Sequence, residues 1–238
     1  MGDNPMALGR RLLTMWNYEK RLQFPVNIKT PNAMLAQAIL SQYGGPDGEL
    51  GASMRYLSQR YSMPYNEVAG VLTDIGTEEL AHLEMVSTIV HQLTRNLSME
   101  EIEKSGFANY YVDHTVGIWP MAAGGIPFNS CEFQSKGDAI TDLFEDMAAE
   151  QKARSTYDNI LRLVKEPDVC APIKFLRERE IVHFQRFGEA LRITQDNLNS
   201  KNFYAFNPGT VDEAMQWSYM WEATKDTQKI TYSCSEDS

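Results

Sequence analysis

Two short elements of this sequence combine a glutamate with a histidine at helical spacing. They are Glu79-Leu80-Ala81-His82 and Glu180-Ile181-Val182-His183. Residues three apart on a helix lie on one face, so each glutamate and its histidine can point at one metal ion from a rigid support. One such pair is a weak signal, because a solvated glutamate beside a half-buried histidine has the same spacing.

A further carboxylate precedes each pair at one fixed distance. Glu49 lies 30 residues before Glu79, and Glu150 lies 30 residues before Glu180. Adding 101 to positions 49, 79 and 82 gives 150, 180 and 183, with the same residue type each time. The set is therefore an internal repeat, and two matching sets are far harder to obtain by chance than one.

This repeat predicts a centre for two metal ions. Carboxylate oxygens and imidazole nitrogens suit manganese and iron, and bridging carboxylates hold two ions close together. Several glutamates buried without a cation would be very costly, and two divalent ions offset that charge. The same arrangement occurs in di-iron and di-manganese carboxylate bundles, so the residues alone leave both metals open.

Four long helices are expected to position these residues, with a Gly- and Pro-rich connection in the middle. The helices span 32–61, 66–97, 136–165 and 168–199, and the connection spans 98–135. Gly44-Gly45-Pro46 should interrupt the first helix. Two helices, a long connection and two more helices predict an all-α, ferritin-like four-helix bundle with one long crossover.

The whole chain, residues 1–238, is expected to form one domain around this bundle. The bundle covers about residues 32–199. Residues 1–31 are expected to form an extended N-terminal arm, and residues 200–238 a C-terminal tail. The aromatic residues of both segments favour packing against neighbouring subunits.

Composition and charge exclude several classes of protein. The net charge is -10 and no Lys/Arg cluster occurs, which argues against nucleic-acid binding. No apolar run reaches the roughly 18 residues of a membrane span, and the start lacks the apolar core of a signal peptide. The three cysteines are widely separated, which suits a reducing compartment. We expect a cytoplasmic protein without a membrane partner.

Four segments of the chain are similar to manganese catalases. They are GELGASMRYLSQRY (48–61), DIGTEELAHLEMVSTIV (74–90), AAEQKARSTY (148–157) and KFLREREIVHFQRF (174–187). The resemblance is closest to the shorter, spore-coat-associated branch of that family, and for that branch it extends over roughly residues 14–195. It therefore also implies the spore coat as a location.

The resemblance implies a role for each repeated residue. Glu49, Glu79 and His82 would hold one manganese ion. Glu79 would bridge to a second manganese ion, which Glu150 and His183 would also hold.

Three further positions follow from the same resemblance. Glu180 would lie just outside the metals and handle protons. Tyr56 matches a tyrosine that supports the metal ligands near the first glutamate. Ala149 stands where the catalases carry an arginine directly before the third glutamate, and losing that cation should lower activity.

The implied reaction is the disproportionation of hydrogen peroxide to water and oxygen by two manganese ions per subunit. Members of the family form hexamers, so a homo-oligomer is expected. Two alternatives stay open. One is a di-iron ferroxidase- or oxidase-like protein, because the same ligand types hold iron. The other is a structural coat component whose fold the metal supports.

Overall fold

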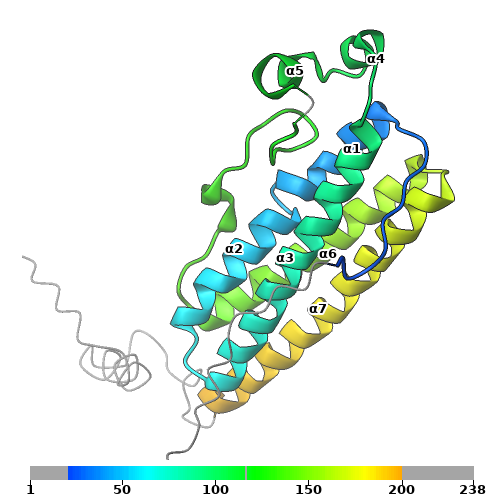
Figure 1. The fold of residues 1–238 in the computed structure, drawn as a ribbon. Helices are drawn as coiled ribbons and strands as arrows, with labels where there is room; N and C mark the ends of the chain where they lie inside the picture. The colour runs from blue at the N-terminus through cyan, green and yellow to red at the C-terminus, as the bar shows by residue number, and fades with distance from the viewer. Residues whose placement is uncertain (1–20, 116, 200–238) are drawn as a thin grey trace, which may run out of the picture.

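The computed structural model describes residues 21–115 and 117–199 (Figure 1). Regular structure in these ranges is helical, with no strand beyond one isolated bridge between Met121 and Pro127. The long helices are α1 (Ala33–Gly44), α2 (Glu49–Gln59), α3 (Asn66–Thr94), α6 (Ala139–Leu163) and α7 (Pro167–Asn199). The short ones are η1 (Arg60–Ser62), α4 (Met99–Lys104), α5 (Ala108–His114) and η2 (Ser130–Phe133).

These helices form the predicted ferritin-like bundle. Helices α1 and α2 follow one another along the same direction and together act as its first long helix (Figure 1). Helix α3 packs along both of them, α6 packs on α7, and α7 also contacts α3. The segment from α4 to η2 connects the two halves. This arrangement confirms the all-α class and the single long crossover. Residues 1–20 of the predicted arm and the whole predicted tail, residues 200–238, lie outside the described residues.

The break between α1 and α2 lies against the crossover and leaves no room for a side chain at Gly44. The backbone N–H of Gly45 donates to the Ser41 carbonyl and closes α1. A Cβ atom at Gly44 would lie 2.3 Å from the backbone nitrogen of Met121, because the crossover passes directly over this turn. A second helix then starts at Glu49. The break thus puts this glutamate in the first turn of α2, where the helix dipole favours negative charge.

The start of α6 is fixed by two aspartates. The side chain of Asp138 caps the helix by accepting the Thr141 N–H. The buried carboxylate of Asp142 accepts the backbone N–H groups of Lys136 and Gly137. These contacts attach the end of the crossover to α6, and they move the helix start three residues later than expected.

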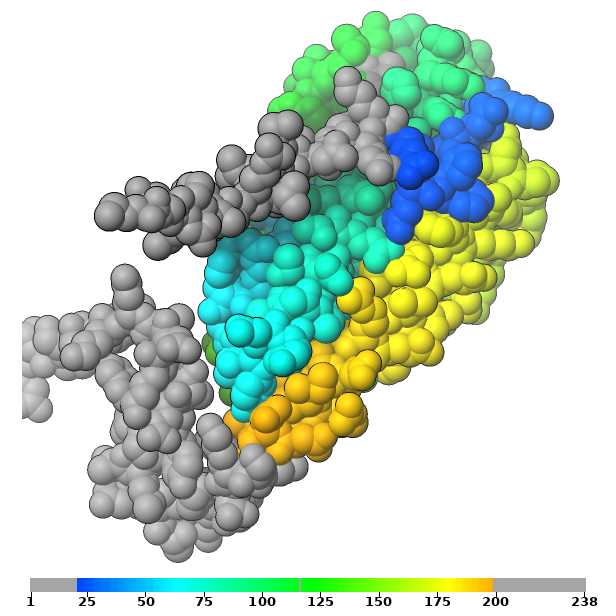
Figure 2. Space-filling model, turned by 60° about the horizontal axis from the view of Figure 1, so that its bottom comes forward, coloured from blue at the N-terminus to red at the C-terminus, as the bar shows by residue number. Residues whose placement is uncertain are grey.

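The described part of the N-terminal arm lies over the junction of α3 and α7 (Figure 2). The Gln92 side chain of α3 accepts the Ile28 N–H and donates to the Val26 carbonyl. The Lys29 N–H donates to Asp168 in α7. The arm therefore pairs its backbone polar groups with side chains of both helices, and its apolar residues join the core.

Two apolar clusters fill the bundle on either side of a polar layer. The larger surrounds Ile39, Ile89 and Ile173, and the smaller surrounds Leu72, Leu143 and Phe187. The Glu-x-x-His elements of α3 and α7 lie between the residues that these helices contribute to the two clusters. Among the described residues, no helix is long and apolar enough to cross a membrane.

Candidate dinuclear metal centre

The structure brings all six repeated residues together inside the bundle. Glu49 comes from α2, Glu79 and His82 from α3, Glu150 from α6, and Glu180 and His183 from α7. Each is at most 2% exposed. Four helices thus contribute to one buried cluster of four carboxylates and two imidazoles.

The carboxylate of Glu79 lies between the two histidines. Its Oε2 is 2.6 Å from His82 Nδ1, and its Oε1 is 2.7 Å from His183 Nδ1. On the outer sides, Glu49 Oε2 is 3.7 Å from His82 Nδ1, and Glu150 Oε2 is 3.6 Å from His183 Nδ1. The matching distances describe two half-sites that share Glu79.

Ligand atoms of these residues form two overlapping groups. Within each group they lie no more than 4.8 Å from one another. One group is Glu49, Glu79, His82 and Glu180, and the other is Glu79, Glu150 and His183. Glu79 belongs to both groups, as a bridging carboxylate should. Glu180 lies within ligand distance of the first half-site, although the resemblance places it outside the metals.

Burial and mutual repulsion shift the charges of the cluster. Burial, with Glu79 adding, raises the pKa of Glu49 to about 8, and burial raises the pKa of Glu180 well above its usual range. Burial alone would lower the pKa of His183, but the neighbouring Glu79 raises it to about 12. Burial would likewise raise the pKa of Glu79, but the two imidazoles hold it below its usual range. Protons thus balance the carboxylates where cations would otherwise do so.

The cluster fits a pair of divalent cations. Five of its buried atoms make no hydrogen bond of good geometry in the described part of the chain, although Glu79 Oε1 and His183 Nδ1 are close neighbours. They are Glu79 Oε1, His82 Nε2, Glu150 Oε2, Glu180 Oε1 and His183 Nδ1. Orphaned buried polar atoms are costly, and each of these is an oxygen or nitrogen with a lone pair for a metal. This donor set suits manganese or iron.

Two tyrosines support the outer carboxylates from opposite halves. The hydroxyl of Tyr56 donates to Glu150 Oε1 at 2.5 Å, so this tyrosine of α2 contacts the carboxylate of α6. Tyr157 of α6 donates in turn to Glu49 of α2. Of the two tyrosines, only Tyr56 was predicted from the sequence. Tyr157 could have been found from the same repeat, because 56 plus 101 is 157.

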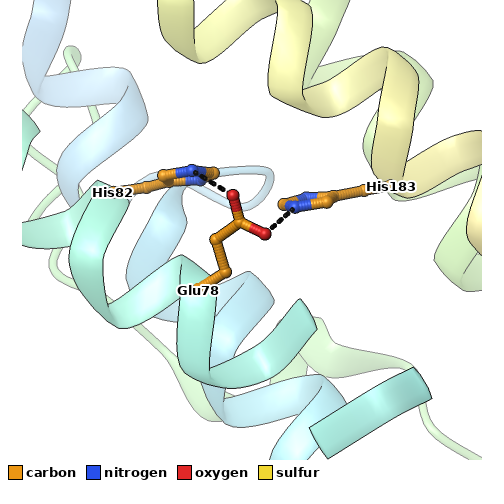
Figure 3. A group of neighbouring side chains, drawn as sticks. All are labelled: Glu78, His82 and His183. Atoms are coloured by element: carbon orange, nitrogen blue, oxygen red, sulfur yellow. Dashed lines mark hydrogen bonds and ion pairs between the residues drawn. The ribbon is translucent and has the colours of Figure 1, made fainter. Parts of the chain in front are cut away.

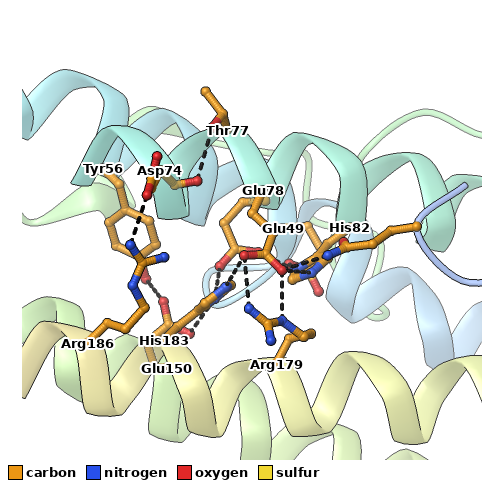
Figure 4. A network of polar contacts seen from close by, with 12 residues as sticks. Glu49, Tyr56, Asp74, Thr77, Glu78, His82, Glu150, Arg179, His183 and Arg186 are labelled. Atoms are coloured by element: carbon orange, nitrogen blue, oxygen red, sulfur yellow. Dashed lines mark hydrogen bonds and ion pairs between the residues drawn. The ribbon is translucent and has the colours of Figure 1, made fainter. Parts of the chain in front are cut away.

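Glu78 was not predicted from the sequence, and its carboxylate lies between His82 and His183 (Figure 3). Its Oε2 is 3.2 Å from His183 Nε2, and its Oε1 is 3.6 Å from His82 Nε2. Arg179 donates to both oxygens of this carboxylate (Figure 4). Gln23 of the arm also donates to Oε1. A carboxylate at Nε2 keeps a proton there and leaves Nδ1 free to bind a metal. In the sequence, Glu78 directly precedes Glu79, and this pair of adjacent glutamates is the feature from which a role for Glu78 could have been predicted.

Ala149, the position at which the resemblance predicts an arginine, is buried in α6. It is 4% exposed and directly precedes Glu150 in α6. The position is therefore packed into the bundle as a methyl group, and it contributes no charge to the cluster.

Fold and cluster together define a ferritin-like bundle with a buried carboxylate–histidine cluster that could hold metal. The family model described as "Manganese containing catalase" matches residues 15–228. The chain belongs to the manganese catalase family.

The chain is also similar to individual named proteins. It is 48% identical to Protein CotJC of Bacillus subtilis (strain 168) over 190 residues, which cover 80% of this chain and 100% of CotJC. It is 30% identical to a probable manganese catalase of Clostridium acetobutylicum, covering 79% of this chain and 85% of that protein. The crystal structure of KatB, a manganese catalase from Anabaena, superposes with a TM-score of 0.70 at 30% identity. That match covers 78% of this chain and 81% of KatB.

Proposed function

We propose that this chain is a dimanganese catalase that converts hydrogen peroxide to water and oxygen. The observation that carries the proposal is the pair of half-sites sharing Glu79, each with a histidine Nδ1 and an outer glutamate. Membership of the manganese catalase family and the likeness to KatB support it.

In this proposal, Glu49, Glu79 and His82 hold one ion, and Glu79, Glu150 and His183 hold the other. Bound manganese would supply the two-electron redox capacity of the reaction. The chain supplies the ligands, fixes their separation with four helices, and excludes bulk water from the cluster.

Proton transfer is the task left to a side chain. Oxidation of one peroxide to oxygen releases two protons, and reduction of the other to two waters consumes two. Glu180 is buried within the first half-site, and its Oε1 has no hydrogen-bond partner in the described ranges. A carboxyl group with a raised pKa can hold a proton near neutral pH, so Glu180 is proposed to carry protons between the two halves of the reaction.

A structural role is the second candidate function. The 48% identity to CotJC and the absence of the arginine at Ala149 favour it. In this reading the protein resides in a spore coat, and the metal centre supports its fold. A cytoplasmic catalase and a coat component are not mutually exclusive, and a di-iron oxidase uses the same ligand types.

Metal analysis paired with oxygen release tests the proposal on one sample. About two manganese ions per chain and rapid oxygen release from peroxide are expected. Two iron ions, or bound manganese without oxygen release, would contradict the catalase proposal.

The substitution His183→Ala tests the ligand assignment. It should remove one metal ligand and abolish turnover, so a variant with full metal content and full activity would overturn the assignment.

We also propose a homo-oligomer, with the hexamer as the expected form. Large apolar side chains are exposed on several helices, including Met54 on α2, Leu80 on α3 and Phe144 on α6. Such residues are candidates for subunit contacts. Light scattering coupled to size-exclusion chromatography measures the mass in solution, and a clean monomer would defeat this expectation.

A further inference from the structure

The two half-sites do not offer a divalent ion the same number of protein atoms. In the first half-site, ligand atoms of four residues lie within 4.8 Å of one another: Glu49, Glu79, His82 and Glu180. In the second half-site, three of the described residues meet the same limit: Glu79, Glu150 and His183. Glu79 belongs to both groups, so the additional residue of the first half-site is Glu180.

Glu180 breaks the symmetry of the sequence repeat. Its equivalent 101 residues earlier, Glu79, is 2.6 Å from His82 Nδ1 and 2.7 Å from His183 Nδ1. Burial raises the pKa of Glu180 and the charge of Glu150 raises it further, so these two carboxyl groups lie close together. No Glu180 oxygen, however, belongs to the second group of ligand atoms. Of the two equivalent glutamates, one is therefore shared and the other adds an oxygen to the first half-site.

The remaining donors of the two half-sites are matched. Glu49 Oε2 is 3.7 Å from His82 Nδ1, and Glu150 Oε2 is 3.6 Å from His183 Nδ1. Each half-site thus has one imidazole and one outer carboxylate at nearly the same separation. These donors give neither half-site an advantage in binding a cation.

The surroundings of the outer glutamates do not cancel the difference. Tyr56, which donates to Glu150, lies close to the charges of Asp146 and Arg55; burial raises its pKa, Asp146 adds to that rise, and Arg55 opposes it. The two charges offset one another when Asp146 is ionised, and a positive charge remains when it is protonated. Neither state favours a cation in the second half-site. In the first half-site, the neutral side chain of Gln42 contacts the corresponding tyrosine.

We propose that the half-sites differ in affinity, so that the first manganese ion binds beside His82 and the second binds more weakly beside His183. The affinity of a protein site for a divalent cation depends on the number and charge of its oxygen donors. Glu180 supplies one more oxygen to the first half-site, and a negative charge when it is ionised. We expect the two dissociation constants to differ by about 10–100-fold, the usual effect of one group that supports a bound metal.

Unequal half-sites would make activity depend on manganese supply. At manganese concentrations between the two dissociation constants, the chain would hold one ion beside His82 and lack the other. A reaction that needs both ions would begin only as the second half-site fills. This consequence rests on the proposed catalase function, whereas the order of binding does not.

Anomalous diffraction from manganese locates the first ion in the unaltered protein. The metal-free chain is given one equivalent of Mn²⁺ in solution before crystallisation. A strong peak beside Glu49 and His82, with a much weaker one beside Glu150 and His183, is expected. Equal peaks, or a stronger peak beside His183, would overturn the proposal. The experiment involves no peroxide, so its failure is distinct from the failure of the catalase function, which oxygen release measures.

His82→Ala and His183→Ala form a matched pair, because each removes one imidazole from one half-site. Electron paramagnetic resonance of unbound Mn²⁺ measures how tightly each variant holds its remaining ion. His183→Ala should bind one ion as tightly as the first step of the unaltered protein, and His82→Ala about 10–100-fold more weakly. Equal dissociation constants, or tighter binding by His82→Ala, would contradict the proposed order.

Glu180→Ala tests the residue that makes the half-sites unequal. Without its oxygen, the affinity for the first ion should fall about 10–100-fold and approach that for the second. Glu178→Ala is the control, because Glu178 lies two residues away on α7 and is exposed, and both binding steps should be unchanged. A first step that is equally tight in Glu180→Ala and in the unaltered protein would overturn the role of Glu180.

Discussion

Glu78 and Arg179 occupy equivalent positions in the two halves of the sequence and pair with one another across the bundle. Each directly precedes a Glu-x-x-His element, and they are 101 residues apart. Arg179 Nε donates to Glu78 Oε1 at 2.7 Å, and Nη2 donates to Oε2 at 3.1 Å. The repeat is therefore symmetric in its metal-facing residues and complementary in charge behind them, so a single ion pair supports both histidines.

Removing the Glu78 carboxylate should weaken metal binding. Glu78→Gln replaces one carboxylate oxygen with an amide N–H donor and removes the negative charge. His183 Nε2 then loses a charged hydrogen-bond acceptor, and His82 Nε2 loses the negative charge 3.6 Å away. Metal affinity should fall about 10–100-fold, the usual effect of losing a residue that orients a metal-bound histidine. Competition with a chelator measures this affinity.

Arg186→Gln is a matched control for Arg179→Gln. Both arginines lie on α7 and pair with an acid of α3, but Arg186 pairs with the exposed Asp74 at 2.9 Å (Figure 4). Arg179→Gln should reduce metal affinity because it frees Glu78 to move, whereas Arg186→Gln should leave affinity unchanged. Equal effects of the two substitutions would contradict a specific role for Arg179.

The two tyrosines should make similar contributions to stability. Tyr56→Phe leaves Glu150 without its hydroxyl donor, and Tyr157→Phe does the same to Glu49. Each should lower the free energy of unfolding of the metal-loaded protein by about 1–3 kcal/mol, since a buried acceptor is left unpaired. Thermal unfolding measures the loss, and Tyr111→Phe on the exposed side chain of α5 should have little effect.

Glu180→Gln separates proton transfer from metal binding. An amide cannot carry the proton, so turnover should fall about 100–10,000-fold, the usual range for removal of a general acid or base. Manganese content should stay near that of the unaltered protein. Loss of manganese instead would make Glu180 a ligand, as its position within the first half-site allows.

Metal binding should release protons. In the metal-free protein at neutral pH, the raised pKa values of Glu49, about 8, and His183, about 12, mean that both groups hold protons. A metal ion needs both groups deprotonated, so apparent affinity should rise with pH by up to about tenfold per pH unit for each proton released. Isothermal titration in buffers of different ionisation enthalpy counts these protons, and affinity independent of pH would contradict this charge balance.

Much of the centre could be predicted because its spacing is set by helical geometry. Glu79 and His82 must share a face at a separation of three residues, and the shift of 101 repeats that constraint at Glu180 and His183. The break at Gly44-Gly45-Pro46 was equally visible. The need for glycine at position 44 was not, because the crossover backbone that excludes a side chain there comes from Pro120 and Met121, far along the chain.

The sequence by itself determined the helical class, the repeated residues and the family. Only the tertiary structure decided which atoms meet: that Tyr56 supports Glu150 rather than its neighbour Glu49, and that Glu78 spans both histidines. The reason is physical, because periodicity fixes the face of one helix on which a residue lies, whereas partners on other helices depend on how those helices pack.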